Sequence, residues 1–384
     1  MSNVELISDA ADLQPLREIW ERLLASAQFY YPTFEQIQRQ LSTPGARGCV
    51  AAVRNGQTLS GITCFGSGAA MRAFTIGERK LFALPVEQVA KIGFQELGAV
   101  DREQWLEIID AVMSRWRFTV LDLGEVVRGS ALHQATERLS HTLLVARGRK
   151  PSIRWFIDVP ATFDEYLDAL RPSTKRNVTY KLRRFEREQA YEFVTISRPE
   201  QVEQFLHDGE AVSRRTYQWA LGQRLENTEQ LRSHYQRLAE QGRLRCHLLY
   251  IDGVPAGFMR NELHAGICNY GTPGFDPLFE KCSPGLVMLL WTIKDLIENT
   301  DCRVFDFGEG GDDQGYKSRF GTRSIECDYI HVYPARKPYS LLIYLAERAL
   351  TLTKNLADAI IGDSSLRQKL KKAIRKYGVE EPPR

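Results

Sequence analysis

The chain contains two faint internal repeats that occur in the same order. The segment VLDLGE around Asp122 returns as VFDFGE around Asp306, 184 positions later. Ahead of each copy, two short apolar runs are joined by a two-residue turn whose glycine is Gly56 in the first copy and Gly253 in the second, 197 positions later. A repeat of this length indicates a duplicated domain and not a solenoid.

Each copy alternates strands and helices in the order expected for a mixed α/β fold. Asn55-Gly56 and Asp252-Gly253 stand between alternating apolar runs, which is a strong signal for a hairpin. An amphipathic helix precedes each VxDxGE segment, because apolar residues recur there at steps of three and four. These residues are Trp105, Ile108, Ile109, Val112 and Trp116 in the first copy, and Leu286, Leu289, Leu290, Ile293 and Ile297 in the second. We therefore predict an α/β (α+β) fold with two tandem halves, each with a mixed central sheet flanked by helices.

The 384 residues are enough for two domains of ordinary size. Gly148 and Pro151 punctuate a short basic linker between the copies. We expect an N-terminal domain at 1–150, a C-terminal domain at 151–338 and a helical tail at 339–384. In the second half, the pattern predicts helices at 162–169, 172–189, 199–222 and 228–242, and strands from residue 245 onward.

Ser283, Pro284 and Gly285 open the helix of the second copy. Ser283 suits the N-cap and Pro284 the first helical position. Gly285 lets a ligand approach the backbone, where the free N–H groups of a helix start favour a phosphate. The segment therefore predicts a site for a nucleotide-type cofactor such as coenzyme A. The first copy has Asp101 and Glu103 at this place, which would repel a pyrophosphate, so we expect a degenerate N-terminal half that serves as scaffold or acceptor wall.

Several segments occur in a characteristic order and spacing, namely RPSTKRNVTYKLRRFERE at 171–188, Ser283-Pro284-Gly285, Asp306-Phe307-Gly308, and Tyr316-Lys317 with Phe320-Gly321. In these the chain resembles the acetyltransferases of the GNAT superfamily found in bacterial cellulose and exopolysaccharide gene clusters, the CelD/BcsL-like proteins, which are related to Fem-type transferases. The likeness covers residues 10–335 and implies two GNAT-like halves with acetyl-CoA, or another acyl-CoA, as donor. It implies a cofactor site formed by Tyr270, Gly271, Thr272, Ser283, Pro284, Gly285 and Leu286.

Three residues are candidates for proton transfer. Tyr316 falls where many GNAT enzymes have a tyrosine near the thiol, so it would protonate the leaving thiolate, or else it packs its helix on the sheet. Asp306 is either a base for the acceptor group or a structural hydrogen-bond acceptor, and its counterpart Asp122 in the other copy favours the structural role. Glu309 directly follows the strand and could take a proton from the acceptor, or it is a solvated loop residue.

Basic residues are candidates for substrate binding. Lys317 could contact an anionic sugar nucleotide or the cofactor phosphates, and Fem-type enzymes have a lysine in a similar context that contacts substrate; an exposed lysine is the alternative. The segment 175–187 carries six cations, which either bind an anionic substrate or form a solvated helical face. From this segment we assign Lys175, Arg176 and Arg183 to the substrate.

Composition narrows the remaining possibilities. The net charge is only +3, which does not favour a nucleic-acid partner. Seven scattered cysteines without a CxxC motif predict reduced, mostly buried thiols, and seven histidines without ligand spacing predict no metal site. The N-terminus has early acids and no signal pattern, and no apolar run approaches the roughly 20 residues of a membrane span. We expect a cytoplasmic protein.

The tail carries an apolar stripe at Leu342, Leu345, Ala349 and Leu352, followed by six basic residues and no acid at 367–376. It is either a helix packed on the catalytic domain or an interfacial helix drawn to anionic lipid at the inner face of the membrane. The whole sequence predicts an acyl-CoA-dependent acyltransferase that acts on a sugar, sugar nucleotide or glycan. A Fem-like transferase that uses aminoacyl-tRNA and a non-catalytic scaffold for polysaccharide synthesis are the alternatives. The sequence does not predict an oligomeric state.

Overall fold

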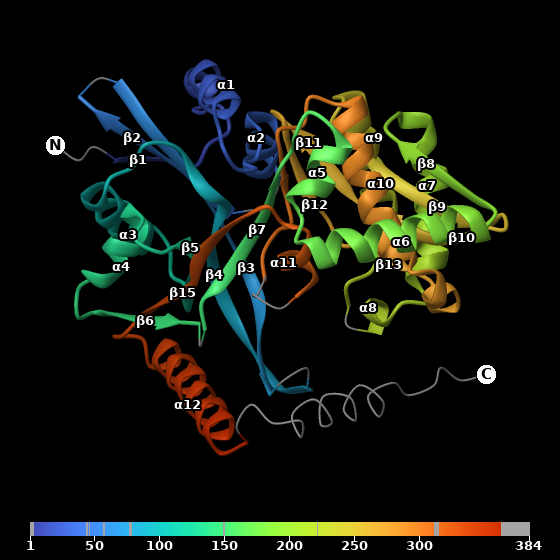
Figure 1. Ribbon diagram of the computed structural model, residues 1–384. Coiled ribbons are helices and arrows are strands. Elements are labelled where there is room, and N and C mark those ends of the chain that lie inside the picture. Colours follow the sequence, from blue (N-terminus) through green and yellow to red (C-terminus); the bar gives the residue numbers. More distant parts are fainter. Residues whose placement is uncertain are drawn as a thin grey trace.

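The computed structural model describes residues 4–43, 45, 47–56, 58–76, 79–148, 150–220, 222–310 and 315–361. It has a mixed α/β fold, as the sequence predicts, with helices packed around a large twisted sheet (Figure 1). Within these ranges, no helix combines the length and the apolar character that a membrane span requires.

One sheet of eleven strands runs through both halves of the chain. Its order is β1 (Val4–Ile7), β2 (Arg47–Asn55), β3 (Thr58–Ile76), β4 (Arg79–Gly98), β5 (Val120–Val127), β15 (Arg323–Pro334), β7 (Ser152–Asp158), β14 (Val304–Asp306), β12 (Ile267–Tyr270) and β11 (Asn261–His264), with β6 (Leu143–Arg147) paired to β15. Strand β15 is the last of the described strands along the chain, yet it lies between β5 and β7. The two central sheets that the sequence predicts are thus joined into one, and the division at residue 150 stays a prediction.

A second sheet of four strands lies in the C-terminal half, in the order β13 (Gly274–Phe275), β10 (Val254–Met259), β9 (Cys246–Ile251) and β8 (Tyr191–Ile196). Strands β9 and β10 pair around Asp252 and Gly253, whose φ angles of 52° and 75° are those a tight primed turn requires. Strands β2 and β3 also form a hairpin, but Asn55 lies in β2 opposite Thr58, so the turn begins at Gly56, one residue later than predicted. Both hairpins predicted from the sequence are confirmed.

The helices form two groups. In the first half they are η1 (Gln14–Leu16), α1 (Arg17–Ala25), α2 (Phe34–Ser42), α3 (Arg102–Arg115) and α4 (Ala131–Glu137). In the second half they are α5 (Phe163–Ala169), α6 (Pro172–Glu188), η2 (Pro199–Gln201), α7 (Val202–Ser213), α8 (Tyr217–Ala220), α9 (Glu229–Glu240), η3 (Pro277–Cys282), α10 (Pro284–Asn299), α11 (Tyr316–Phe320) and α12 (Pro338–Ile361). The predicted apolar stripes of α3 and α10 face two separate hydrophobic cores.

The duplication is clearest at Asp122 and Asp306. Strand β5 runs parallel to β4 at Asp122, and β14 runs parallel to β12 at Asp306. In both copies the glycine two positions later has a left-handed backbone, with φ 66° at Gly124 and 70° at Gly308, and its N–H donates to the aspartate Oδ1 at 2.8 Å. The same local structure in both segments supports the interpretation of the repeat as a domain duplication.

The helix predicted at 199–222 is wrong as a single element, because the chain leaves the helix after Ser213. The hydroxyl of Ser213 accepts a hydrogen bond from the N–H of Leu225 at 3.0 Å, and the Thr216 hydroxyl donates to the Ser213 carbonyl at 2.8 Å. Such side-chain bonds compete with the helical pattern. The result is the separate helices α7 and α8, which place the residues after 216 beside the cavity described below.

Helix α12 packs against β3, β6 and β15 through Ile343, which is fully buried. An ion pair between Arg72 of β3 and Glu347 of α12 fastens the contact. The predicted apolar stripe faces outward, since Leu342, Leu345 and Leu352 are 55%, 53% and 56% exposed. The basic segment at 367–376 lies outside the described residues.

Candidate active site

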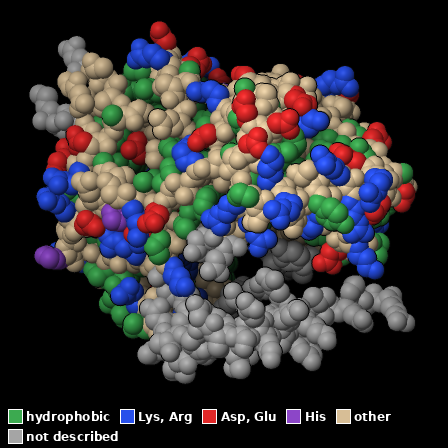
Figure 2. Space-filling model, in the orientation of Figure 1, with side chains coloured by type: hydrophobic (Ala, Val, Ile, Leu, Met, Phe, Trp, Pro, Cys, Tyr) green, Lys and Arg blue, Asp and Glu red, His purple; other side chains and the backbone are tan. Residues whose placement is uncertain are grey.

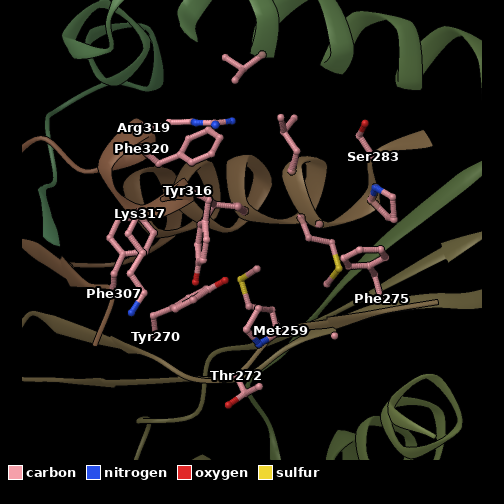
Figure 3. A pocket seen from close by; sticks show the side chains of 18 of the residues that line it. Met259, Tyr270, Thr272, Phe275, Ser283, Phe307, Tyr316, Lys317, Arg319 and Phe320 are labelled. Carbon is pink, nitrogen blue, oxygen red and sulfur yellow. The ribbon is translucent and has the colours of Figure 1, made fainter. Parts of the chain in front are cut away.

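A cavity of about 1060 Å³ opens where β12 and β14 diverge. β12 pairs with β14 as far as Asn269, and beyond Tyr270 the chain crosses to pair as β13 with β10 of the other sheet. Helix α10 begins on one side of this gap, α6 passes over it and α11 closes a third side (Figure 3). The cavity is lined by Tyr270, Gly271, Thr272, Ser283, Pro284, Gly285, Leu286, Glu309, Tyr316 and Lys317, so most of the predicted site residues are brought together.

The start of α10 forms one wall of the cavity. Pro284 is its first residue, as predicted, but Ser283 has a left-handed backbone (φ 55°, ψ 47°) and makes no side-chain capping bond. Ser283 thus occupies the predicted N-cap position, but its side chain does not cap the helix, because η3 ends immediately before it and the chain reverses there. A non-glycine residue in this region is strained, which is common at ligand sites. A Cβ added at Gly285 would lie 3.2 Å from the Phe275 ring, so the wall is closely packed.

The matching helix start in the first half is closed. The side chain of Asp101 accepts from the N–H of Gln104 at 2.8 Å, and the Gln104 side chain accepts from the N–H of Asp101 at 2.9 Å. This reciprocal capping box occupies donors that a phosphate would need and adds a negative charge. That the N-terminal copy has no donor site stays a prediction, which this capping box favours.

Tyr316 begins α11 and is 45% exposed in the cavity. Its hydroxyl is hydrogen-bonded to that of Tyr270, and Figure 3 shows the two hydroxyl groups turned toward each other. Burial, reinforced by this bond, raises the pKa of Tyr270 well above its ordinary value. Tyr270 therefore stays protonated, and the pair presents O–H groups to the cavity. The sequence resemblance places Tyr270 in the cofactor site and does not indicate this partnership.

Glu309 lies at the end of the cavity that faces the first half. Glu309 is exposed at the surface, and the hydroxyl of Tyr329 donates to its Oε2 at 3.3 Å. Burial and the neighbouring carboxylate of Glu125 raise the pKa of Glu309. A Cβ added at Gly124 would lie 3.9 Å from Glu309 Oε1, so the first half forms the wall here. A carboxyl with a raised pKa is suited to accept a proton near neutral pH.

Lys317 holds the loop on which Glu309 lies. Its Nζ donates to the carbonyl of Gly308 at 3.2 Å and to that of Glu309 at 2.5 Å. Burial lowers the pKa of Lys317 below its ordinary value. The side chain lines the cavity, so contact with a substrate is compatible with this position, but its present bonds position the loop.

Asp306 does not line the cavity and is fully buried. Its carboxylate accepts from Arg154, with 2.8 Å between Nη2 and Oδ2, and the same guanidinium donates to Glu125 through Nη1 at 3.2 Å. Together with the bond to Gly308, these contacts favour the structural role that the sequence left open for Asp306. A role as base stays an untested prediction.

The face of helix α6 that lines the cavity is not the one that carries the predicted substrate-binding residues Lys175, Arg176 and Arg183. Ser173, Thr174, Asn177, Val178 and Lys181 line it, spaced as one helical face. Lys175 is instead paired with Asp168, and Arg176 and Arg183 are exposed outside the lining. Arg171, at the N-cap of α6, and Arg319 of α11 bring positive charge to the cavity. No spacing in the sequence distinguished Arg319.

The thiols are as expected, since all seven cysteines are unpaired and six are buried. Among the described residues, no group of three histidine, cysteine, aspartate or glutamate side chains is placed to hold a metal ion.

The chain thus has an α/β fold with a cavity where two parallel strands diverge, and comparisons with known proteins indicate the class of its C-terminal half. Residues 172–318 match the family model of an acetyltransferase (GNAT) domain, a range that runs from the start of α6 into α11. The C-terminal half is therefore similar to GNAT domains. No curated protein sequence is significantly similar to the chain.

Solved structures share the fold at low sequence identity. A crystal structure of FemX has a TM-score of 0.56 and 9% identity, covering 85% of this chain and 98% of its own. The C-terminal domain of an Agrobacterium fabrum protein named as a lysylphosphatidylglycerol synthetase has a TM-score of 0.50 and 11% identity, covering 89% and 97%. A tandem GNAT protein from the clavulanic acid biosynthesis pathway gives 0.46 and 13%, covering 87% and 99%. At these identities the first two likenesses show the fold alone.

Proposed function

We propose that the protein is an acyl-CoA-dependent acyltransferase that moves an acetyl group, or another short acyl group, to an amine or hydroxyl. The observation that carries the proposal is that the glycine-containing start of α10 and the paired hydroxyls of Tyr316 and Tyr270 line one cavity. The match of residues 172–318 to the GNAT domain supports the same class.

The cavity fits the donor. The N-terminus of α10 offers backbone N–H groups and the positive end of its dipole, which suit the pyrophosphate. The cavity between the diverging strands β12 and β14 is lined by Gly271 and Thr272, a position that suits a pantetheine arm. Arg171, Lys181 and Arg319 add the positive charge that a phosphate-rich molecule needs. Acyl-CoA would supply the activated thioester.

The chain's own groups account for the proton movements. Glu309 takes the proton from the acceptor nitrogen or oxygen as that atom forms its bond to the acyl carbon. As the carbon–sulfur bond breaks, Tyr316 gives its proton to the leaving sulfur, and Tyr270 stabilises the phenolate by hydrogen bonding. Positioning in the cavity contributes most of the rate, because the acceptor and the thioester meet in a fixed geometry.

We place the acceptor at the Glu309 end, between the two halves, where Gly124 and Tyr329 approach it. Polar residues of α6 and the segment after α7, among them Ser173, Asn177, Gln218 and Gln223, line the cavity and suit a polyhydroxylated acceptor such as a sugar, sugar nucleotide or glycan. Membership of the CelD/BcsL-like family and a role in exopolysaccharide synthesis remain part of this proposal, and they rest on the sequence resemblance. Because acyl-CoA is a cytoplasmic metabolite, the proposal places the enzyme in the cytoplasm.

Calorimetric titration with acetyl-CoA and with CoA tests the donor site. We expect micromolar binding by the wild-type protein and its loss in Gly285→Glu, since the new carboxylate would meet Phe275 and the phosphates. Gly68→Glu is the matched control, because a Cβ at Gly68 meets nothing within 4 Å. Equal binding of acetyl-CoA by both variants would show that the donor site lies elsewhere. Absence of binding to the wild type would refute the acyl-CoA proposal and lead to the two alternatives. RNA binding that weakens steeply with salt would then favour the aminoacyl-tRNA-dependent transferase over the scaffold.

A further inference from the structure

Helix α12 is apolar on two opposite faces. One face carries Ile343 and Leu350 and packs on the sheet. The opposite face, which we call the outer face, consists of Leu341, Leu342, Leu345, Ala349 and Leu352 and is exposed. A helix that is apolar all round is normally enclosed on both sides. In the described part of the chain, this face carries the longest row of exposed leucines. We therefore expect an apolar partner to cover it.

The charges around the outer face are positive. Glu347 is the one acid of the described helix up to residue 354, and it points inward to Arg72. Arg336 and Arg348 are exposed at the start and at the edge of the outer face. Figure 2 shows hydrophobic and basic side chains side by side at the lower left of the molecule, over α12. The sequence that follows has six basic residues and no acid at 367–376.

We propose that the outer face of α12 docks on an anionic lipid bilayer and holds the enzyme at the membrane surface. Exposed leucines beside basic residues are the composition of helices that lie in the headgroup region, with the apolar side chains in the acyl boundary and the cations at the phosphates. A second copy of the chain is the weaker candidate for an occupant, because two such surfaces would bring like charges together.

The docking arrangement leaves the catalytic cavity accessible. The outer face and the lining of the cavity share no residue, and they lie on different elements, α12 on one side and α6, α10 and α11 on the other (Figure 1). The proposal therefore stands independently of the acyltransferase function. If both hold, the acceptor is a molecule made or used at a membrane surface.

Vesicle sedimentation with the full-length protein tests the proposal. We expect the wild type to sediment with vesicles of equal parts phosphatidylglycerol and phosphatidylcholine, and much less with phosphatidylcholine alone. The double variant Leu342→Ser, Leu345→Ser should bind the anionic vesicles at least tenfold more weakly. Leu278→Ser is the matched control, because Leu278 is an 81% exposed leucine on η3, away from α12. It should bind like the wild type.

Three outcomes would overturn the proposal. In the first case, the wild type fails to sediment with either kind of vesicle. In a second case the double variant binds as well as the wild type while deletion of 362–384 abolishes binding, which would assign the contact to the terminal segment alone. In a third, light scattering shows a dimer that the double variant breaks, which would make the outer face an interface between copies. Circular dichroism and thermal midpoints confirm folding, and both should be preserved because the substituted leucines are exposed.

Discussion

Arg154 and Asp306 form a buried ion pair behind the cavity wall, with 2.8 Å between Nη2 and Oδ2. Arg154 lies on β7 and Asp306 on β14, and the other side of the guanidinium reaches Glu125 of β5 at 3.2 Å. One cation thus joins the strands of both copies of the VxDxGE segment. Removal of this cation would leave two carboxylates buried without a counter-charge.

Arg154→Met should lower the free energy of unfolding by about 3–5 kcal/mol, because breaking a buried pair leaves uncompensated charge. Urea denaturation followed by circular dichroism measures the change. The control is Arg184→Met, which removes an exposed pair with Glu188 and should leave the urea midpoint unchanged. Equal midpoints for Arg154→Met and the wild type would show that the buried pair does not hold the halves together.

Tyr316→Phe should lower kcat about 100-fold while acetyl-CoA binds with unchanged affinity, since only the proton for the leaving thiolate is lost. Steady-state kinetics, with a thiol-reactive reagent that detects the released CoA, measure kcat. Calorimetry measures the affinity for acetyl-CoA. Tyr180→Phe is the control, because Tyr180 is 64% exposed and outside the cavity. An unchanged kcat in Tyr316→Phe would leave this tyrosine with only a packing role.

Glu309 should set the acid side of the pH profile. The base must be deprotonated, so kcat/KM falls as the pH falls through the pKa of Glu309. Because burial and Glu125 raise this pKa, the fall should occur above the ordinary glutamate value of about 4.3. Glu309→Gln should remove this limb and lower the rate at pH values above the pKa of Glu309. A limb that persists in the variant would assign the base to another group.

His331 should make the fold less stable in acid. Burial, with Arg72 nearby, lowers the pKa of His331 from 6.5 to about 3. The unfolded chain therefore binds more protons between these values, and stability that is present above pH 6.5 is lost as the pH falls toward 3. The free energy of unfolding should drop by about 1 kcal/mol per pH unit in this window.

Urea titrations at several pH values measure this slope in the wild type and in His331→Gln, which should have a shallower one. His141→Gln, at an exposed histidine, should retain the wild-type slope. Parallel slopes for the wild type and His331→Gln would mean that other groups cause the loss.

The sequence predicts most of the fold because its strongest signals are local. The turns at Asn55-Gly56 and Asp252-Gly253 and the apolar stripes of α3 and α10 depend on spacing within a few residues. The sequence does not predict that β15 joins the two halves. Strands that pair across some 200 positions produce no local periodic pattern in either segment. The break after Ser213 was missed because side-chain bonds, and not proline or glycine, end the helix.

The candidate site could be predicted where the backbone is decisive and less well where side-chain direction matters. The segments at 270–272 and 283–286 reach the cavity because strand and helix ends place them there. Charge alone points to Lys175, Arg176 and Arg183, but the helix turns Ser173, Asn177 and Lys181 toward the cavity. The pairing of Tyr316 with Tyr270 depends on elements that meet only in the folded chain.

The position of β15 has a consequence for biosynthesis. The ribosome makes β5, β6 and β7 long before residues 323–334 emerge, and β15 pairs with all three. Until then, these strands expose edges that invite pairing with other nascent chains. A prematurely terminated product would keep these open edges, so we expect it to aggregate and not to accumulate as an independent N-terminal half. Completion of the large sheet therefore waits for the synthesis of residues 323–334.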